Sequence, residues 1–162
     1  MSANVLFVFG LGFSARALAT RLLSEGWVVR GTTRSLEKAE HLRDAGIEVC
    51  LFDSASPLRD LHVLDDVTHL LSSVPPGPDG DPVLNLHAAD IAARAGQIFW
   101  AGYLSTTGVY GDCGGDWVDE LTTPDPTTER GVRRVAAEAG WCSLHQAPVS
   151  YTHLTLPTIY SV

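Results

Sequence analysis

The sequence predicts an α/β fold in which a doubly wound parallel sheet carries helices on both faces. Short apolar runs alternate along the chain with segments whose apolar residues recur at helical spacing, and this alternation is typical of parallel sheets. The first run, Asn4–Phe9, is almost wholly apolar, as expected of a strand buried on both faces. With 162 residues, the chain has room for one domain.

The first half of the chain contains three predicted strands and two predicted helices. The strand Asn4–Phe9 ends at Gly10-Leu11-Gly12, and Gly26 ends the amphipathic helix that follows. Ser35 is placed to cap a second helix, which continues to Leu42. The second and third predicted strands are Trp27–Gly31 and Ile47–Phe52.

The second half continues the alternation and contains two exposed loops. Pro, Gly and Asp residues mark the loops Gly77–Pro82 and Gly108–Pro126. The remaining predicted elements are a short helical stretch at Leu58–Leu64, strands at Val67–Val74 and Ile98–Leu104, and helices at Val83–Ala95 and Thr128–Trp141.

Composition and charge exclude several classes of protein. The 45% hydrophobic and 19% charged residues exclude disorder, collagen and coiled coil, and no apolar run is long enough to span a membrane. The net charge of −8 argues against a nucleic-acid partner. We recognise no signal peptide, no metal-ligand spacing and no paired cysteines, so we expect a cytoplasmic protein with reduced thiols. Nothing indicates the oligomeric state.

A glycine motif follows the first strand and opens the first helix. The segment reads Gly10-Leu11-Gly12-Phe13-Ser14-Ala15, or GxGxxA. Gly10 permits a tight turn, Gly12 lets the backbone approach a pyrophosphate, and Ala15 lets helix and strand pack closely. Together with Phe13 and Ser14, these residues predict a dinucleotide site at the helix N-terminus, and a small anionic partner suits the balanced charge of residues 1–60. The alternative is a tight turn that binds nothing.

The end of the second strand favours NADP over NAD. An NAD site typically has an acidic residue there for the ribose hydroxyls. This chain has Thr32-Thr33-Arg34-Ser35, and an arginine with hydroxyl neighbours suits a 2′-phosphate. Asp53, which follows the third strand, is a candidate acceptor for the adenine amino group. The alternatives are a solvated Arg34 and an ordinary turn carboxylate.

Three segments together resemble the extended and atypical short-chain dehydrogenase/reductases, the NAD-dependent epimerase/dehydratase family. These are the glycine motif, Ser105-Thr106-Thr107-Gly108-Val109-Tyr110-Gly111 and Trp117-Val118-Asp119-Glu120. The resemblance covers residues 4 to about 147 and implies a Rossmann fold. It also implies that Thr106 hydrogen-bonds the substrate oxygen and that its neighbour Ser105 helps to bind the cofactor, although a strand cap of hydroxyl residues is the alternative.

The chain departs from this family where the family carries its catalytic Tyr and Lys. Arg130 stands at the position of the Tyr and Arg134 at that of the Lys. An arginine stays protonated and therefore does not act as a general acid near neutral pH. We expect Arg134 to keep the ribose contact and Arg130 to hold an anionic substrate or polarise a carbonyl; the alternative is a solvated helix face.

The composition changes at Val149–Val162, which carries no charge. This segment resembles the translation of a sequencing adaptor, so we expect a nucleotide-binding domain at residues 1–148, truncated before its last strands and substrate lobe, and a non-native tail at 149–162. The alternative is a genuine edge strand. The predicted function is an NADP-dependent oxidoreductase or epimerase-like enzyme acting on a small hydroxyl or carbonyl compound. The other hypothesis is a non-catalytic redox sensor or scaffold that binds NAD(P).

Overall fold

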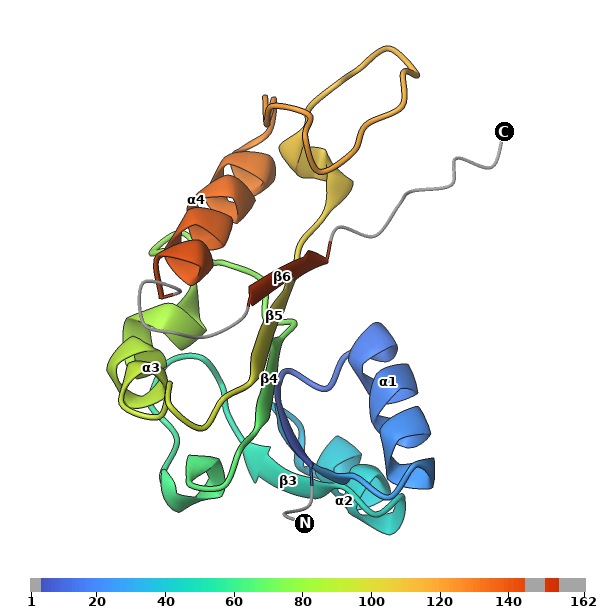
Figure 1. The fold of residues 1–162 in the computed structure, drawn as a ribbon, viewed down its shortest axis with the longest axis vertical. Helices are drawn as coiled ribbons and strands as arrows, with labels where there is room; N and C mark the ends of the chain where they lie inside the picture. Colours follow the sequence, from blue (N-terminus) through green and yellow to red (C-terminus); the bar gives the residue numbers. More distant parts are fainter. Residues whose placement is uncertain (1–3, 145–150, 155–162) are drawn as a thin grey trace.

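The computed structural model describes residues 4–144 together with the backbone of residues 151–154 (Figure 1). The described strands form one parallel six-stranded sheet in the order β3-β2-β1-β4-β5-β6. The strands are β1 (Val5–Phe9), β2 (Val28–Thr33), β3 (Glu48–Leu51), β4 (His69–Ser72), β5 (Trp100–Leu104) and β6 (Tyr151–Leu154). The helices are α1 (Phe13–Ser24), α2 (Leu36–Asp44), α3 (Pro82–Ala92) and α4 (Glu129–Ser143), with 3₁₀ turns at His62–Leu64 and Thr107–Val109.

The helices cover both faces of the sheet, as the sequence predicts. Figure 1 shows α1 and α2 on one side and α3 and α4 on the other. Every residue of β1 is buried, and its side chains alternate between two hydrophobic clusters. Val5, Phe7 and Phe9 pack in the larger cluster, and Leu6 and Val8 pack in the cluster that contains α1 residues. The predicted doubly wound α/β fold is confirmed.

Of the predicted helical stretch Leu58–Leu64, only the last three residues, His62–Leu64, are helical, and they form a 3₁₀ turn. The N–H of Leu58 donates to His87 on α3, and the N–H of His62 donates to Asp60, at 3.1 and 2.9 Å. The backbone N–H groups of this segment therefore pair with α3 and with a local side chain instead of forming the regular backbone hydrogen bonds of an α-helix.

A sixth strand lies at Tyr151–Leu154, inside the segment that we expected to be non-native. It pairs in parallel with β5, with Ala101 opposite Tyr151. This arrangement matches the alternative of an edge strand, while the adaptor-like origin of Val149–Val162 stays a prediction. The rest of that segment lies outside the described residues.

Candidate functional site

The glycine turn lies where the order of the sheet reverses, between β1 and β4. Gly10 has a φ of +84°, a conformation that favours glycine, and a Cβ there would lie 3.1 Å from both Ser73 Oγ and Val74 Cγ2. The Gly10 N–H donates to Thr32 Oγ1 at 2.8 Å, and the Ser73 hydroxyl donates to the Gly10 carbonyl. Residues at the ends of the strands on both sides of β1 therefore hold this peptide in place.

The N-terminus of α1 differs from those of the other described α-helices. Side chains of Ser35, Asp81 and Thr128 cap α2, α3 and α4. The α1 N-cap is Gly12, which makes no side-chain cap, and the first turn of α1 contains no acidic residue. The first N–H groups of α1 thus meet no capping side chain and no carboxylate of the first turn, and such a terminus is suited to an anion.

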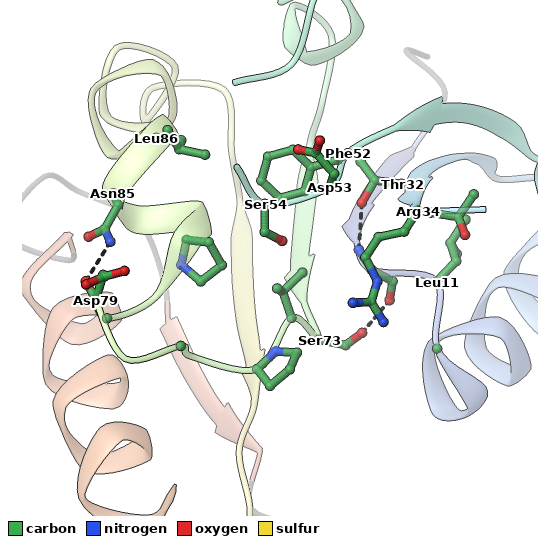
Figure 2. Close-up of a pocket in the computed structure, with 18 of the residues that line it drawn as sticks. Leu11, Thr32, Arg34, Phe52, Asp53, Ser54, Ser73, Asp79, Asn85 and Leu86 are labelled. Atoms are coloured by element: carbon green, nitrogen blue, oxygen red, sulfur yellow. Dashed lines mark hydrogen bonds between the residues drawn. The ribbon is translucent and has the colours of Figure 1, made fainter. Parts of the chain in front are cut away.

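A cavity of about 560 Å³ opens beside this turn, at the carboxyl ends of the strands (Figure 2). Figure 2 shows Thr32 and Arg34 on one side of the cavity and Asn85 and Leu86 of α3 on the other. A volume of this size is typical of small-molecule and cofactor sites. The lining residues are Gly10–Gly12, Thr32–Arg34, Lys38, Phe52–Ser54, Ser73–Pro75, Gly77, Asp79, Gly80, Pro82, Asn85 and Leu86.

Two cations, Arg34 and Lys38, line the cavity at the end of β2. Lys38 lies on the first turns of α2, where partial burial and the charges of Arg16 and Arg34 lower its pKa. The strand end carries no acidic residue, since it reads Thr32-Thr33-Arg34-Ser35. The positive charges are therefore concentrated beside the open helix N-terminus, where a second anionic group of a ligand would be held.

The hydroxyl neighbours of Arg34 are engaged in local hydrogen bonds. Thr32 Oγ1 accepts from Gly10, Thr33 Oγ1 accepts from the Ser35 N–H at 3.4 Å, and Ser35 Oγ accepts from the Lys38 N–H at 3.2 Å. These hydroxyls build the strand end and cap α2, so Arg34 and Lys38 are the groups at this end of the cavity that are suited to an anion.

Asp53 lies in the cavity wall, after Phe52 and at the end of β3. Its Oδ1 accepts the N–H groups of Ala55 and Ser56 at 2.9 and 3.3 Å, and the first of these bonds is the main reason why its pKa lies below the usual value. The carboxylate therefore stabilises the turn and also faces the cavity.

The other predicted site residues lie outside the cavity lining. Phe13 is 85% exposed and Ala15 is buried against the sheet, on the turn of α1 that also contains Ser14. Thr106 Oγ1 accepts from the Gly108 N–H at 3.3 Å, and Arg130 is exposed. The structure thus gathers Gly10, Gly12, Arg34 and Asp53 around one cavity and places the predicted substrate-contacting residues after β5 and on α4.

Arg134 and Ser105 both tie the end of β5 to α4. Arg134 Nη1 donates to the Tyr103 hydroxyl at 2.9 Å and to the Leu104 carbonyl at 2.8 Å, with its guanidinium 5.5 Å from the Tyr103 ring centre. Burial raises the pKa of Tyr103 to about 12. The Ser105 hydroxyl donates to the buried carboxylate of Glu138.

Sequence reasoning missed Lys38, Ser73 and Tyr103. Lys38 lies four residues after Arg34, in the first turn of the helix that the Ser35 cap predicts, and this nearness to Arg34 is a signal in the sequence. Ser73 and Tyr103 carry no such signal, because their roles come from contacts with Gly10 and Arg134, which are 63 and 31 residues away in the chain.

The described residues contain neither a membrane-spanning helix nor a cluster of metal-ligating side chains. No described helix combines the length and the apolar character needed to cross a membrane. In the same part of the chain, no three His, Cys, Asp or Glu side chains gather closely enough to bind a metal ion.

Comparison with known proteins relates the chain to proteins about twice its length. No family model matches the chain. The Escherichia coli K12 protein YeeZ is 32% identical in an alignment of 153 positions that covers 87% of this chain and 53% of that protein. A functionally unknown conserved protein from Silicibacter pomeroyi is 44% identical, with a TM-score of 0.80, over 92% of this chain and 52% of that one.

More distant structures share the fold. A Bacillus cereus UDP-glucuronic acid 4-epimerase in complex with NAD has a TM-score of 0.71 and 19% identity, over 93% of this chain and 56% of its own. Alfalfa vestitone reductase has a TM-score of 0.74 and 18% identity, over 95% and 56%. The chain therefore has a Rossmann fold, which it shares with this epimerase and this reductase over about half of their length.

Proposed function

We propose that this chain binds a nicotinamide dinucleotide in the cavity beside β1 and serves an oxidoreductase or epimerase of the short-chain dehydrogenase/reductase type. The observation that carries the proposal is the open N-terminus of α1, which faces a cavity at the switch point of the sheet. In open α/β sheets, ligands bind at this point and phosphates lie at the helix N-terminus. Gly10 and Gly12 would hold the pyrophosphate, with Phe13, Ser14 and Ala15 supplying the first turn of the helix.

We further propose that NADP is preferred to NAD. Arg34 and Lys38 would bind the 2′-phosphate, since both line the cavity at the end of β2, where the strand carries no carboxylate. Asp53, in the next part of the wall, would accept a hydrogen bond from the adenine amino group.

The test compares NADP⁺ and NAD⁺ dissociation constants for the wild type and Arg34→Ser by titration calorimetry. Loss of a charged hydrogen-bond donor predicts about 10- to 100-fold weaker NADP⁺ binding, with NAD⁺ binding little changed. Arg21→Ser is the matched control, because Arg21 is an exposed arginine that pairs with Glu25 on α1. Equal affinities for the two nucleotides in the wild type would rule out the NADP preference.

A second variant tests the cavity itself. A Cβ at Gly12 would lie 3.7 Å from Ser73 Oγ, an ordinary contact, and the φ of Gly12 is −75°, so we expect Gly12→Val to fold. Its side chain stands before the helix N-terminus, and we expect it to abolish binding of both nucleotides. Unchanged binding by a folded Gly12→Val protein would place the nucleotide elsewhere or exclude it.

The bound nicotinamide would supply hydride transfer to or from a small hydroxyl or carbonyl substrate. Thr106, with Ser105 as its neighbour, would orient the substrate oxygen, and Arg130 would hold or polarise the substrate. The contacts of Arg134 with Tyr103 and Leu104 support a role in fixing the end of β5.

The second candidate function is a non-catalytic sensor of NAD(P). It is favoured by Arg130 and Arg134, which stand at the positions that resemble the catalytic Tyr and Lys of the family, because an arginine does not act as a general acid near neutral pH. NADPH oxidation with a panel of carbonyl compounds separates the two functions. Turnover supports the enzyme, whereas unequal affinities for NADPH and NADP⁺ without turnover support the sensor.

A further inference from the structure

His87 is the most deeply buried titratable side chain near the cavity. It lies on α3, one residue after the cavity-lining Leu86, and none of its surface is exposed. Its ring contacts two other elements: it stacks on Phe9, the last residue of β1, at 5.5 Å and lies 5.7 Å from Phe52, which lines the cavity. The imidazole thus lies directly behind the wall of the proposed nucleotide site.

The hydrogen bonds of His87 define which nitrogen carries the proton. Nε2 lies 3.1 Å from the backbone nitrogen of Leu58, which has only a proton to offer, so Nε2 is the acceptor. Nδ1 therefore carries the proton and donates it to Asp90 Oδ2 at 2.9 Å. Among the described contacts of the ring, Asp90 supplies the one titratable partner, while β1 and the end of β3 contribute Phe9 and Phe52.

These contacts join three parts of the cavity wall. Phe9 directly precedes the turn at Gly10, Phe52 begins the segment that contains Asp53, and Leu58 ends it. The helix α3 itself contributes Pro82, Asn85 and Leu86 to the lining.

We propose that His87 is a positioning residue for nucleotide binding, whose imidazole fixes residues 52–58 against the glycine turn and α3. The first three of these residues form part of the cavity wall. The inference rests on the proposed nucleotide site and adds a residue that does not itself line the cavity. The wall holds the part of the ligand that NADP and NAD share, so both should depend on His87 equally.

The test uses His87→Met and His87→Gln, a matched pair of similar length. Both lose the ring, but Gln keeps an oxygen that accepts the Leu58 N–H, whereas Met leaves that buried donor unpaired. We expect His87→Met to bind NADP⁺ and NAD⁺ about tenfold or more weakly, by the same factor, and His87→Gln to recover most of the loss. An Arg34 variant instead changes the ratio of the two affinities.

The control is Gln97→Met, which removes a hydrogen bond of 3.0 Å to the Leu64 carbonyl, far along the same β3–β4 connection. It should leave both affinities unchanged, although it also removes an anchor of that connection. Wild-type affinity in a folded His87→Met protein, or an equal loss in the control, would overturn the proposal.

Two readouts do not require a nucleotide. The ¹⁵N spectrum of the wild type should show a protonated Nδ1 and an unprotonated Nε2 on His87, and exchange of the Leu58 amide should accelerate in His87→Met. A protonated Nε2 would contradict the proposed role. The spectrum is recorded on the wild type, so this readout is valid even if the variants do not fold. If wild-type protein binds neither nucleotide while both readouts agree, the proposed function fails and the structural role of His87 remains separately established.

Discussion

At the scale of single residues, Lys38 is informative because its protonated amine is destabilised in the folded protein before any ligand binds. Partial burial and the neighbouring charges of Arg16 and Arg34 lower its pKa below the ordinary 10.5. A bound phosphate favours the protonated amine and therefore raises that pKa again. Binding of a 2′-phosphate must then be accompanied by proton uptake wherever the free amine is partly deprotonated.

This linkage predicts a pH dependence that separates the two nucleotides. As the pH rises toward the ordinary lysine pKa of 10.5, the affinity for NADP⁺ should fall, because the free protein loses the Lys38 proton at a lower pH than an unperturbed lysine does. NAD⁺ lacks the phosphate, so its affinity should change less. Calorimetric titrations over this range measure both.

Lys38→Met provides the control, because it removes the titrating amine. The difference between the pH profiles of NADP⁺ and NAD⁺ should then shrink. Parallel profiles in the wild type would show that Lys38 does not contact the phosphate. The same lowered pKa predicts for the free protein that the unfavourable contribution of Lys38 to folding disappears as pH rises, since the unfolded chain binds the proton more tightly.

At the scale of elements, the four described α-helices divide by their caps. Three begin at Ser35, Asp81 and Thr128, whose side chains accept backbone N–H groups, and the fourth begins at Gly12 without one. Asp81 does more than cap. Its Oδ1 accepts from Val83 and Leu84, while its Oδ2 accepts the buried Trp141 indole N–H at 3.0 Å and so joins α3 to α4.

Asp81→Ala should therefore cost more stability than removal of a simple cap. The lost cap contributes about 1 kcal/mol and the unpaired indole N–H about 1–3 kcal/mol, for a total of about 2–4 kcal/mol. Thr128→Ala removes a cap alone and should cost about 1 kcal/mol. Urea unfolding measures both free energies, and equal losses would show that the bond to Trp141 contributes little.

Local sequence signals predicted the elements well because their physical causes are local. The apolar run at β1, the Ser35 cap and the Thr128 start are each determined within a few residues. The hydrogen bond between Asp81 and Trp141 joins residues that are 60 positions apart, and no sequence pattern near either residue predicts it. For the same reason, the glycine motif predicted the turn, whereas Ser73 became visible only once β4 lay beside β1.

At the scale of the whole molecule, the strand order converts separate segments into one site. The chain places β1, β2 and β3 outward in one direction, then crosses back to β4 on the other side of β1 and continues to β5. The carboxyl ends of β1 and β4 therefore lie side by side, and the cavity lies at this reversal. Residues from the ends of β1, β2, β3 and β4 and from α3 all line it. A ligand there touches most of the sheet and is expected to stabilise the folded chain globally.

Thermal unfolding should report this coupling. A ligand that binds only the folded state stabilises it by about 2.7 kcal/mol at a concentration 100 times its dissociation constant. For a chain of this size, that corresponds to a rise in Tm of roughly 5–11 °C. At the same concentration NAD⁺ should raise Tm less than NADP⁺, because it lacks the phosphate for Arg34 and Lys38. Gly12→Val should show no rise with either nucleotide, and a rise in that variant would locate binding away from the α1 N-terminus.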